Sequence, residues 1–178
     1  MDKLDIVTDE SGNKVVLLPE IIFSNKQNIN WDDVEDYLGK YVGELIEIAE
    51  TRDIIYIGNK FPDEYGGSSY TRKTKGARAK AKANAAQGIR EMVEIATDKV
   101  YRENHKEKHS EDAHNGWFYY VTRFAIPLYD NEKKTGEYNV YSACLVVNHA
   151  ANGKMYLYDI MNIKKETSNL FQSEDITQ

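Results

Sequence analysis

The sequence predicts an α+β fold in which N-terminal helices, one of them long and basic, precede an antiparallel β-meander of three to four strands. Apolar residues recur at helical spacing in the first hundred residues and at a spacing of two after residue 116. Helices followed by strands form the α+β pattern. The chain has 178 residues, of which 41% are hydrophobic and 29% are charged, a balance that fits one globular domain.

The organisation along the chain follows from turn signals and polarity. Residues 1–20 read as a lead-in or a short hairpin, because a Ser-Gly-Asn turn at 11–13 precedes the apolar run 15–18. Residues 21–168 form the single α+β domain. Residues 169–178 form a polar tail that we expect to fray.

The first helix is expected to begin near Asn30, a good N-cap residue that precedes an acidic first turn. Residues 53–58 read as a strand that ends in a glycine turn. The Gly- and Ser-rich stretch 59–76 reads as a loop. The long basic helix follows over residues 77–99, where strong helix formers dominate, and Gly88 is the point at which it can break in two.

Strands follow at 117–128, 137–148 and 154–163, where side chains alternate with a period of two. Turns are expected at 130–136 and 150–153. Arg123 lies in the middle of the first of these strands, so it must reach solvent or meet an acceptor. That acceptor is either a bound phosphate or an acidic residue of the N-terminal third.

The net charge of −6 argues against a nucleic-acid binder, but the charge is unevenly distributed. Residues 1–50 carry −8, whereas residues 51–100 carry +4. Residues 71–82 contain six bases and no acid, which indicates either a solvated helix face or a contact with phosphates. These bases are Arg72, Lys73, Lys75, Arg78, Lys80 and Lys82.

Histidine, cationic and hydroxyl side chains supply the candidate chemistry. Three of the four histidines lie at 105–114, and imidazole suits general acid/base work, so His109 is the catalytic candidate, with surface histidines in a polar linker as the alternative. The last strand ends in Lys164, Lys165 and Thr167, which either stabilise a phosphate or protect a sheet edge. No HExxH pattern or paired cysteine is present, so we expect neither a metal nor a cofactor.

Acid/base, cation and hydroxyl groups without a metal are the components of a metal-independent ribonuclease. No phosphate-binding glycine loop or dinucleotide motif argues for another enzyme class, and a transferase such as an ADP-ribosyltransferase finds no matching pattern. No apolar run reaches the length of a membrane span, and no signal peptide or second cysteine is present. We therefore expect a cytoplasmic protein with no membrane contact.

Four segments resemble a known family: YIGNKFPDEYGGSSYTRKTKGARAKAKANAAQGI, KH followed by AHNGW, TRFAIPLYD and YLYDIMNIKKETS. Together they resemble a domain of phage and mobile-element proteins that often ends MuF-type phage-head polypeptides. We associate that domain with the barnase–EndoU–colicin–RelE nuclease superfamily. The resemblance spans residues 21–168 and implies helices followed by an antiparallel sheet.

The resemblance also implies roles for residues of this chain. His109 would act as acid or base, Arg123 with Lys164 or Lys165 would hold the phosphate, and Thr167 would supply a hydroxyl. Lys75 and Lys80 would contact the RNA backbone. The acidity of the chain departs from what is usual for a nuclease.

Two functions of different class remain open. The first is a toxin-type, metal-independent RNA endonuclease that cleaves by attack of the 2′-hydroxyl, with tRNA or rRNA as substrate and possible control by an immunity protein. The second is a non-catalytic phage-encoded module that engages a host protein or nucleic acid. It would use the basic segment 71–82 or the acidic N-terminal third.

Overall fold

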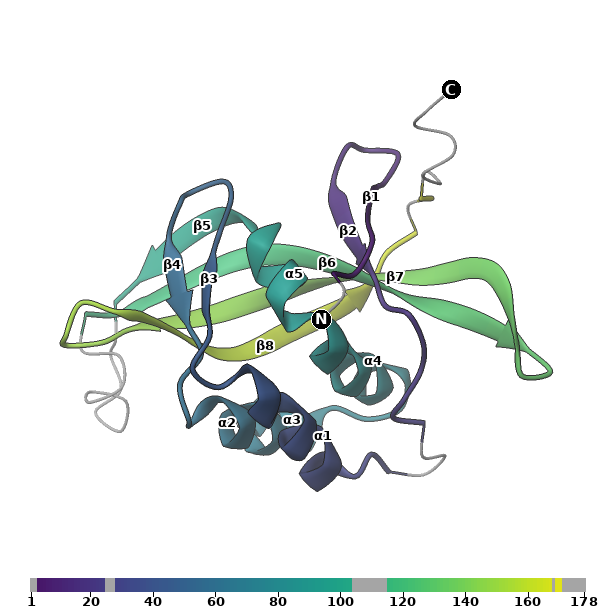
Figure 1. The fold of residues 1–178 in the computed structure, drawn as a ribbon, viewed down its shortest axis with the longest axis horizontal. Coiled ribbons are helices and arrows are strands. Elements are labelled where there is room, and N and C mark those ends of the chain that lie inside the picture. The colour runs from purple at the N-terminus through teal and green to yellow at the C-terminus, as the bar shows by residue number, and fades with distance from the viewer. Residues whose placement is uncertain (1–2, 25–27, 104–114, 168, 171–178) are drawn as a thin grey trace.

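A computed structural model shows short helices gathered on one side of a long curved sheet (Figure 1). The structure describes residues 3–24, 28–103, 115–167 and 169–170. No helix in these ranges is both long and apolar enough to cross a membrane.

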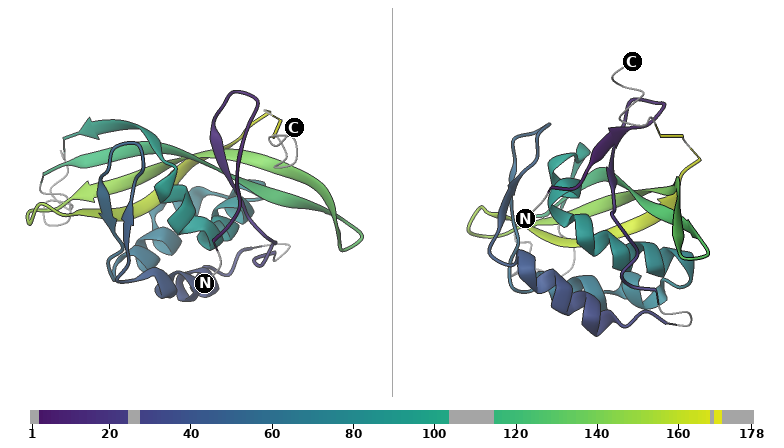
Figure 2. Two further views of the ribbon diagram at one scale, coloured as in Figure 1. Left: turned by 45° about the horizontal axis from the view of Figure 1, so that its top comes forward. Right: turned by 45° about the vertical axis from the view of Figure 1, so that its right-hand side comes forward.

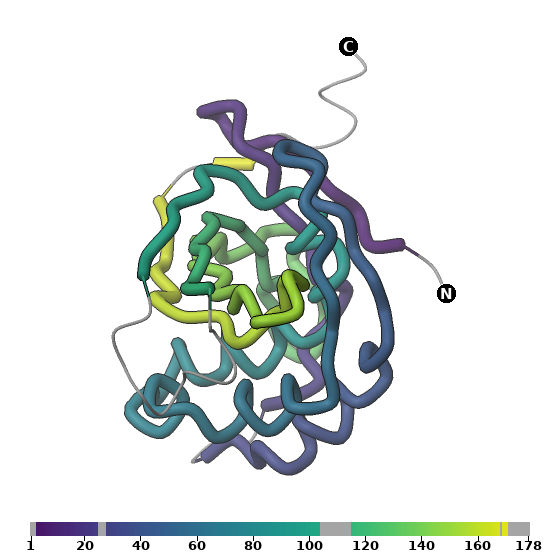
Figure 3. Tube along the Cα trace, turned by 90° about the vertical axis from the view of Figure 1, so that its left-hand side faces the viewer, coloured from purple at the N-terminus to yellow at the C-terminus, as the bar shows by residue number. Residues whose placement is uncertain are grey.

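Within the described residues, eight strands join into one mixed sheet that curves into a half-barrel (Figure 3). Its order is β1-β2-β6-β7-β8-β4-β3, and β5 pairs with the first part of β6. The strands are β1 (Ile6–Thr8), β2 (Lys14–Leu17), β3 (Leu45–Glu47), β4 (Ile54–Tyr56), β5 (Thr97–Arg102), β6 (Trp117–Asp130), β7 (Lys133–His149) and β8 (Met155–Lys165).

This sheet overturns the predicted fold class. β6, β7 and β8 are consecutive antiparallel strands, but β2 pairs parallel to β6 and β4 pairs parallel to β8. The predicted fold class, N-terminal helices followed by an antiparallel meander of three to four strands, is therefore wrong. The missed strands have three to six residues, too few for a period of two to be recognised, and both parallel pairings join segments distant in sequence.

The helices lie beneath this sheet (Figure 2). They are α1 (Trp31–Leu38), α2 (Phe61–Gly67), α3 (Ser69–Lys73), α4 (Ala77–Ala85) and α5 (Ile89–Glu94). Asn30 caps α1 as expected, because its side chain accepts from the backbone N–H groups of residues 32 and 33. The loop expected at 59–76 is instead α2 and α3. Pro62 in the first turn and Ser68 as an N-cap were the overlooked helix signals.

Gly88 interrupts the long basic helix, as expected. The chain passes through a 3₁₀ turn at Ala86–Gly88 between α4 and α5. A Cβ at Gly88 would lie 3.1 Å from Leu18 Cδ2, so the missing side chain lets the helix approach the chain that follows β2. The predicted helix was too long, because α5 ends at Glu94 and residues 97–102 form β5.

The β6–β7 hairpin is longer and tighter than expected. Its turn is made by Asn131 and Glu132, which have φ values of 50° and 68°, so both strands run further than the turn predicted at 130–136 allowed. The hairpin extends beyond the helices as an arm (Figure 1).

The two faces of β6–β8 have different neighbours. The inner face packs Tyr120, Phe124 and Leu145 against the helices in the main hydrophobic core. The opposite side, called the outer face here, carries Trp117, Val146 and their neighbours in a separate small cluster. The β1–β2 hairpin, expected as one reading of residues 1–20, packs Val7 and Val15 on Ala125 and Val140.

Candidate functional site

Three polar side chains stand in a row across the outer face. Arg123 of β6 pairs directly with Ser142 of β7, and Ser142 pairs with Lys164 of β8. Residues directly opposite in neighbouring strands project from the same face. An irregularity of β8 beside Asn162, whose φ is 52°, shifts the register and brings Lys164 rather than Ile163 to this face.

Glu166 completes this row. Its Oε1 accepts a hydrogen bond of 2.7 Å from Arg123 Nε, and the two side chains are 26% and 19% exposed. Among the described residues the terminal Nη groups of Arg123 make no hydrogen bond, so they can donate to a ligand. The acceptor that Arg123 requires therefore lies near the C-terminus and not in the acidic N-terminal third.

Helix α3 brings further cations to this edge of the sheet. The backbone N–H of Ile163 donates to Tyr70 Oη over 2.9 Å, which fixes α3 beside the end of β8. Arg72 and Lys73, at the end of α3, and Lys164 and Lys165 are all exposed. Thr167 is also exposed, two residues beyond the end of β8. The cations of α3 and of β8 thus belong to neighbouring elements.

A basic groove lies at the start of α4. Arg72, Lys75 and Lys80 line a cavity of about 590 Å³ together with Trp31, and Arg78 is exposed nearby. The first turn of α4 carries no acid, and no side chain caps it, so its free N–H groups add a positive potential. The groove combines positive charge with an aromatic side chain, a composition that suits a phosphate backbone and its bases.

Lys82 does not belong to this basic surface. It has no exposed area, and its Nζ donates to Asp159 Oδ1 and to Thr71 Oγ1, each over 2.6 Å. Burial lowers the pKa of Lys82 and raises that of Asp159, although each charge partly counteracts the shift of the other. The predicted contact of Lys82 with nucleic acid is therefore wrong in this fold.

Aromatic and apolar side chains occupy the outer face next to the polar row. Trp117 and Tyr158 make an edge-to-face contact with ring centroids 5.0 Å apart. Tyr119 is partly buried beside them, and Arg102 lies 6.0 Å from its ring centroid. Such rings can stack on bases, because every base presents a π face.

His109, the predicted catalytic residue, lies outside the described residues. Among the described residues, no group of three or more His, Cys, Asp or Glu side chains could hold a metal ion. The pairing of Glu166 with Arg123 and the hydroxyl of Ser142 were missed from the sequence, although the strand period would have aligned Ser142 with Arg123 once the hairpin register was known.

No family model, curated protein or solved structure matches this chain.

Proposed function

We propose that this protein is a metal-independent endoribonuclease whose reaction takes place on the outer face of the sheet. The observation that carries the proposal is the row Arg123–Ser142–Lys164 with Glu166 held 2.7 Å from Arg123. It combines a carboxylate base with two cations on a partly open surface. A base and cations that stabilise the developing charge are groups that can promote phosphodiester cleavage without a metal.

In the proposed step the 2′-hydroxyl oxygen of RNA attacks the adjacent phosphorus, and the Glu166 carboxylate takes the hydroxyl proton. The bond from phosphorus to the 5′ oxygen breaks, and this oxygen takes a proton from an acid, for which His109 is the prediction from sequence. Arg123 and Lys164 stabilise the charge that collects on the non-bridging oxygens. The products are a 2′,3′-cyclic phosphate and a 5′-hydroxyl.

Substrate binding follows from the surroundings of the row. The cations at the end of α3 lie beside β8 and can hold the backbone, while Tyr119 offers a ring for stacking. A toxin acting in this way would work in the cytoplasm on tRNA or rRNA, and an immunity protein would cover the same face. Expression of the active chain is then expected to arrest growth.

The test is incubation of the pure protein with total tRNA and rRNA in EDTA. We expect discrete fragments from the wild type and a loss of about 100-fold in Glu166→Gln, since a general base contributes that much or more. Glu47→Gln is the matched control, because Glu47 also pairs with an arginine, Arg52, at 3.0 Å but belongs to β3 and not to the row. Intact RNA in all lanes, or equal cleavage by both variants, would overturn the proposal.

The basic groove favours a second function, a non-catalytic module that binds single-stranded nucleic acid. Its specific support is Trp31 among Arg72, Lys75 and Lys80 in one cavity. This function requires binding without cleavage. It also predicts that Lys75→Glu with Lys80→Glu abolishes binding while Glu166→Gln has no effect.

A further inference from the structure

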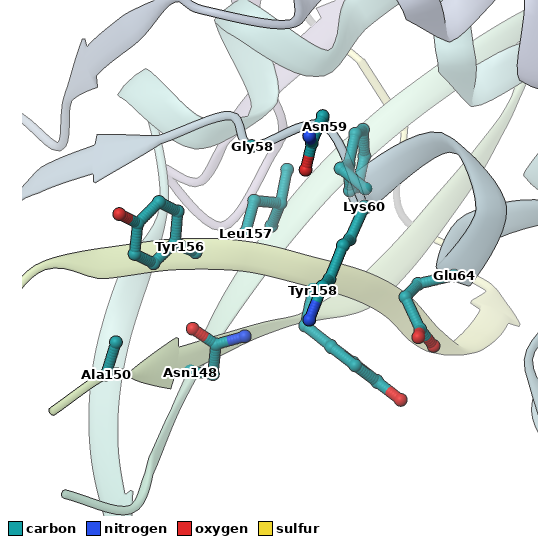
Figure 4. Close-up of a pocket in the computed structure, with 10 residues that line it drawn as sticks. Gly58, Asn59, Lys60, Glu64, Asn148, Ala150, Tyr156, Leu157 and Tyr158 are labelled. Atoms are coloured by element: carbon teal, nitrogen blue, oxygen red, sulfur yellow. The ribbon is translucent and has the colours of Figure 1, made fainter. Parts of the chain in front are cut away.

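A second cavity lies where β4 runs into α2, against the start of β8. It measures about 270 Å³, close to the lower end of the range for small-ligand pockets. Phe61 and Leu157, both buried, supply apolar surface, and Tyr156 and Tyr158 supply aromatic surface. Lys60 and Glu64 bring charges to it, and Figure 4 shows Lys60 extending from the β4–α2 connection toward Tyr158.

Asn148 is the unusual member of this pocket. The residue is only 8% exposed, and its Oδ1 is buried with no hydrogen-bond partner among the described residues. A buried acceptor without a donor loses the hydrogen bond that it would make to water, so it destabilises the empty pocket. Because Asn148 lines the cavity, a ligand placed there can supply the missing donor.

The aromatic wall is held in place by its neighbours. The Tyr156 ring lies against Gly58, where an added Cβ would come within 3.3 Å of Cδ1. On another side the Tyr156 ring packs on Tyr56, with centroids 5.7 Å apart. Tyr156 also pairs with Asn148 across the two strands, so ring and amide project from the same face. A planar ligand therefore meets a fixed ring and an amide together.

We propose that this pocket binds a single nucleobase. A base has a π face for Tyr156 and an edge on which an N–H donor stands beside an acceptor, which matches the Asn148 amide. Glu64 is positioned to accept from further N–H or hydroxyl groups of the same nucleotide. The choice of ligand class rests on the proposed function, and the base comes either from an RNA strand or from a free nucleotide.

The pocket and the polar row lie on one face of the same strand. Asn148 and Ser142 are both on β7 and are six residues apart, so they share a face and are separated by about 20 Å. On this face Trp117 lies directly opposite Asn148, and Tyr119 lies between Asn148 and Ser142. A bound base at Asn148 would thus fix the position of a strand whose phosphate, a few nucleotides away, lies at Arg123.

The experiment measures binding of AMP, CMP, GMP and UMP to the full chain by calorimetry, with ribose 5-phosphate as the ligand that lacks a base. At least one nucleotide is expected to bind about tenfold or more tightly than ribose 5-phosphate, the difference that one satisfied buried acceptor provides. Equal affinity of ribose 5-phosphate and all four nucleotides would overturn the proposal.

Two substitutions of Asn148 test whether the preference for a nucleotide over ribose 5-phosphate arises at this residue. Asn148→Ala and the nearly isosteric Asn148→Leu are expected to remove this tenfold preference, and neither deletes a side-chain hydrogen bond to another described residue. Asn139→Ala, on the same strand but outside the pocket, is the matched control and should bind as the wild type does. Retention of the preference in folded Asn148 variants would overturn the proposal.

A trinucleotide with 2′-deoxy sugars, which cannot be cleaved by 2′-hydroxyl attack, separates the two sources of the base. Binding much tighter than that of a mononucleotide supports an RNA strand, and similar binding supports a free nucleotide. Failure of the two proposals is distinguishable. Base-dependent binding without RNA cleavage would overturn only the ribonuclease, whereas cleavage without base-dependent binding would overturn only the pocket.

Discussion

Two ion pairs with carboxylates on or just after β8 have opposite surroundings. Lys82 and Asp159 meet at 2.6 Å with no exposed side-chain area. Arg123 and Glu166 meet at 2.7 Å, and both side chains remain partly exposed. The distances are almost the same, so geometry alone does not separate their roles.

The difference in solvation separates them. The ammonium of Lys82 also donates to Thr71 and lies 4.6 Å from the ring centroid of Tyr65 and 5.0 Å from that of Tyr70. All its interactions are internal, and a ligand cannot reach it. Arg123 keeps donors available on a partly open face. The buried pair therefore fixes how α4 packs on β8, and the partly exposed pair is the one that a ligand can reach.

The largest expected effect comes from breaking the buried pair. Lys82→Met leaves Asp159 without its cation in a dry site, and loss of one partner of such a pair costs about 3–5 kcal/mol. Urea unfolding followed by circular dichroism measures this loss. Lys80→Met, two residues earlier on α4 and half-exposed, should change stability by less than about 1 kcal/mol.

The double variant Lys82→Met with Asp159→Leu sharpens this prediction. Replacing both charges by apolar side chains removes the uncompensated carboxylate, so most of the lost stability should return. A double variant as unstable as Lys82→Met would show that the loss arises from packing and not from the unpaired charge.

Breaking the partly exposed Arg123–Glu166 pair is expected to change stability little and RNA cleavage strongly. Arg123→Ala should lower stability by at most about 1 kcal/mol, because partly exposed pairs contribute little. If the proposed reaction is correct, RNA cleavage should fall by about 100-fold or more, since the guanidinium would stabilise charge in its transition state. Thermal unfolding and cleavage are measured on the same sample.

Arg52→Ala is the control for Arg123→Ala. Arg52 makes a similar contact with Glu47 at 3.0 Å on an exposed surface, so its loss should affect neither stability nor cleavage. A large loss of stability in Arg123→Ala would instead assign Arg123 a structural role like that of Lys82.

The sequence could predict elements with strong local signals. Asn30 before an acidic turn located α1, and the regular alternation after Trp117 located β6, β7 and β8. The strand expected at 53–58 contains β4, but the mixed sheet could not be predicted, because β3 and β4 have three residues each and the parallel pairing of β4 with β8 joins distant segments. Such short strands are stabilised by their neighbours and not by their own residue preferences.

The candidate site, like the fold, could be predicted from the sequence only in part. Arg123 in mid-strand indicated a need for an acceptor, and that inference came from the residue itself. The identity of Glu166 depends on the β7–β8 register, which contains an irregularity that no local pattern announces. Lys82 was misassigned because a lysine in a basic helix resembles a surface residue until its partner Asp159, far along the chain, is known.

A smaller effect is expected from the cations beside the row. If RNA contacts Arg72 and Lys73, the double variant Arg72→Gln with Lys73→Gln removes up to two phosphate contacts. The slope of log affinity against log salt should then become less steep by about 0.7 per contact. Fluorescence anisotropy with a labelled 2′-deoxy oligonucleotide measures the slope. Lys133→Gln at the tip of the β6–β7 hairpin, an exposed lysine outside this region, is the control, and an equal change there would contradict the assignment.

The smallest effect concerns Glu35, a carboxyl that forms no ion pair with a cation of the described residues. Burial, followed by a hydrogen bond with Asp63 and its charge, raises the pKa of Glu35 from 4.5 to about 7. Between these values the folded chain holds a proton that the unfolded chain has released, so stability falls as the pH rises from 4.5 to 7. Because the group is largely solvated, we expect a fall of roughly 0.5 kcal/mol, visible as a small decrease in Tm. Glu35→Gln should lose this pH dependence of stability, while the control Glu10→Gln should keep it. An unchanged pH dependence in Glu35→Gln would mean that water solvates the Glu35–Asp63 pair too well for it to affect folding. The dry Lys82–Asp159 pair would then differ from it in this respect.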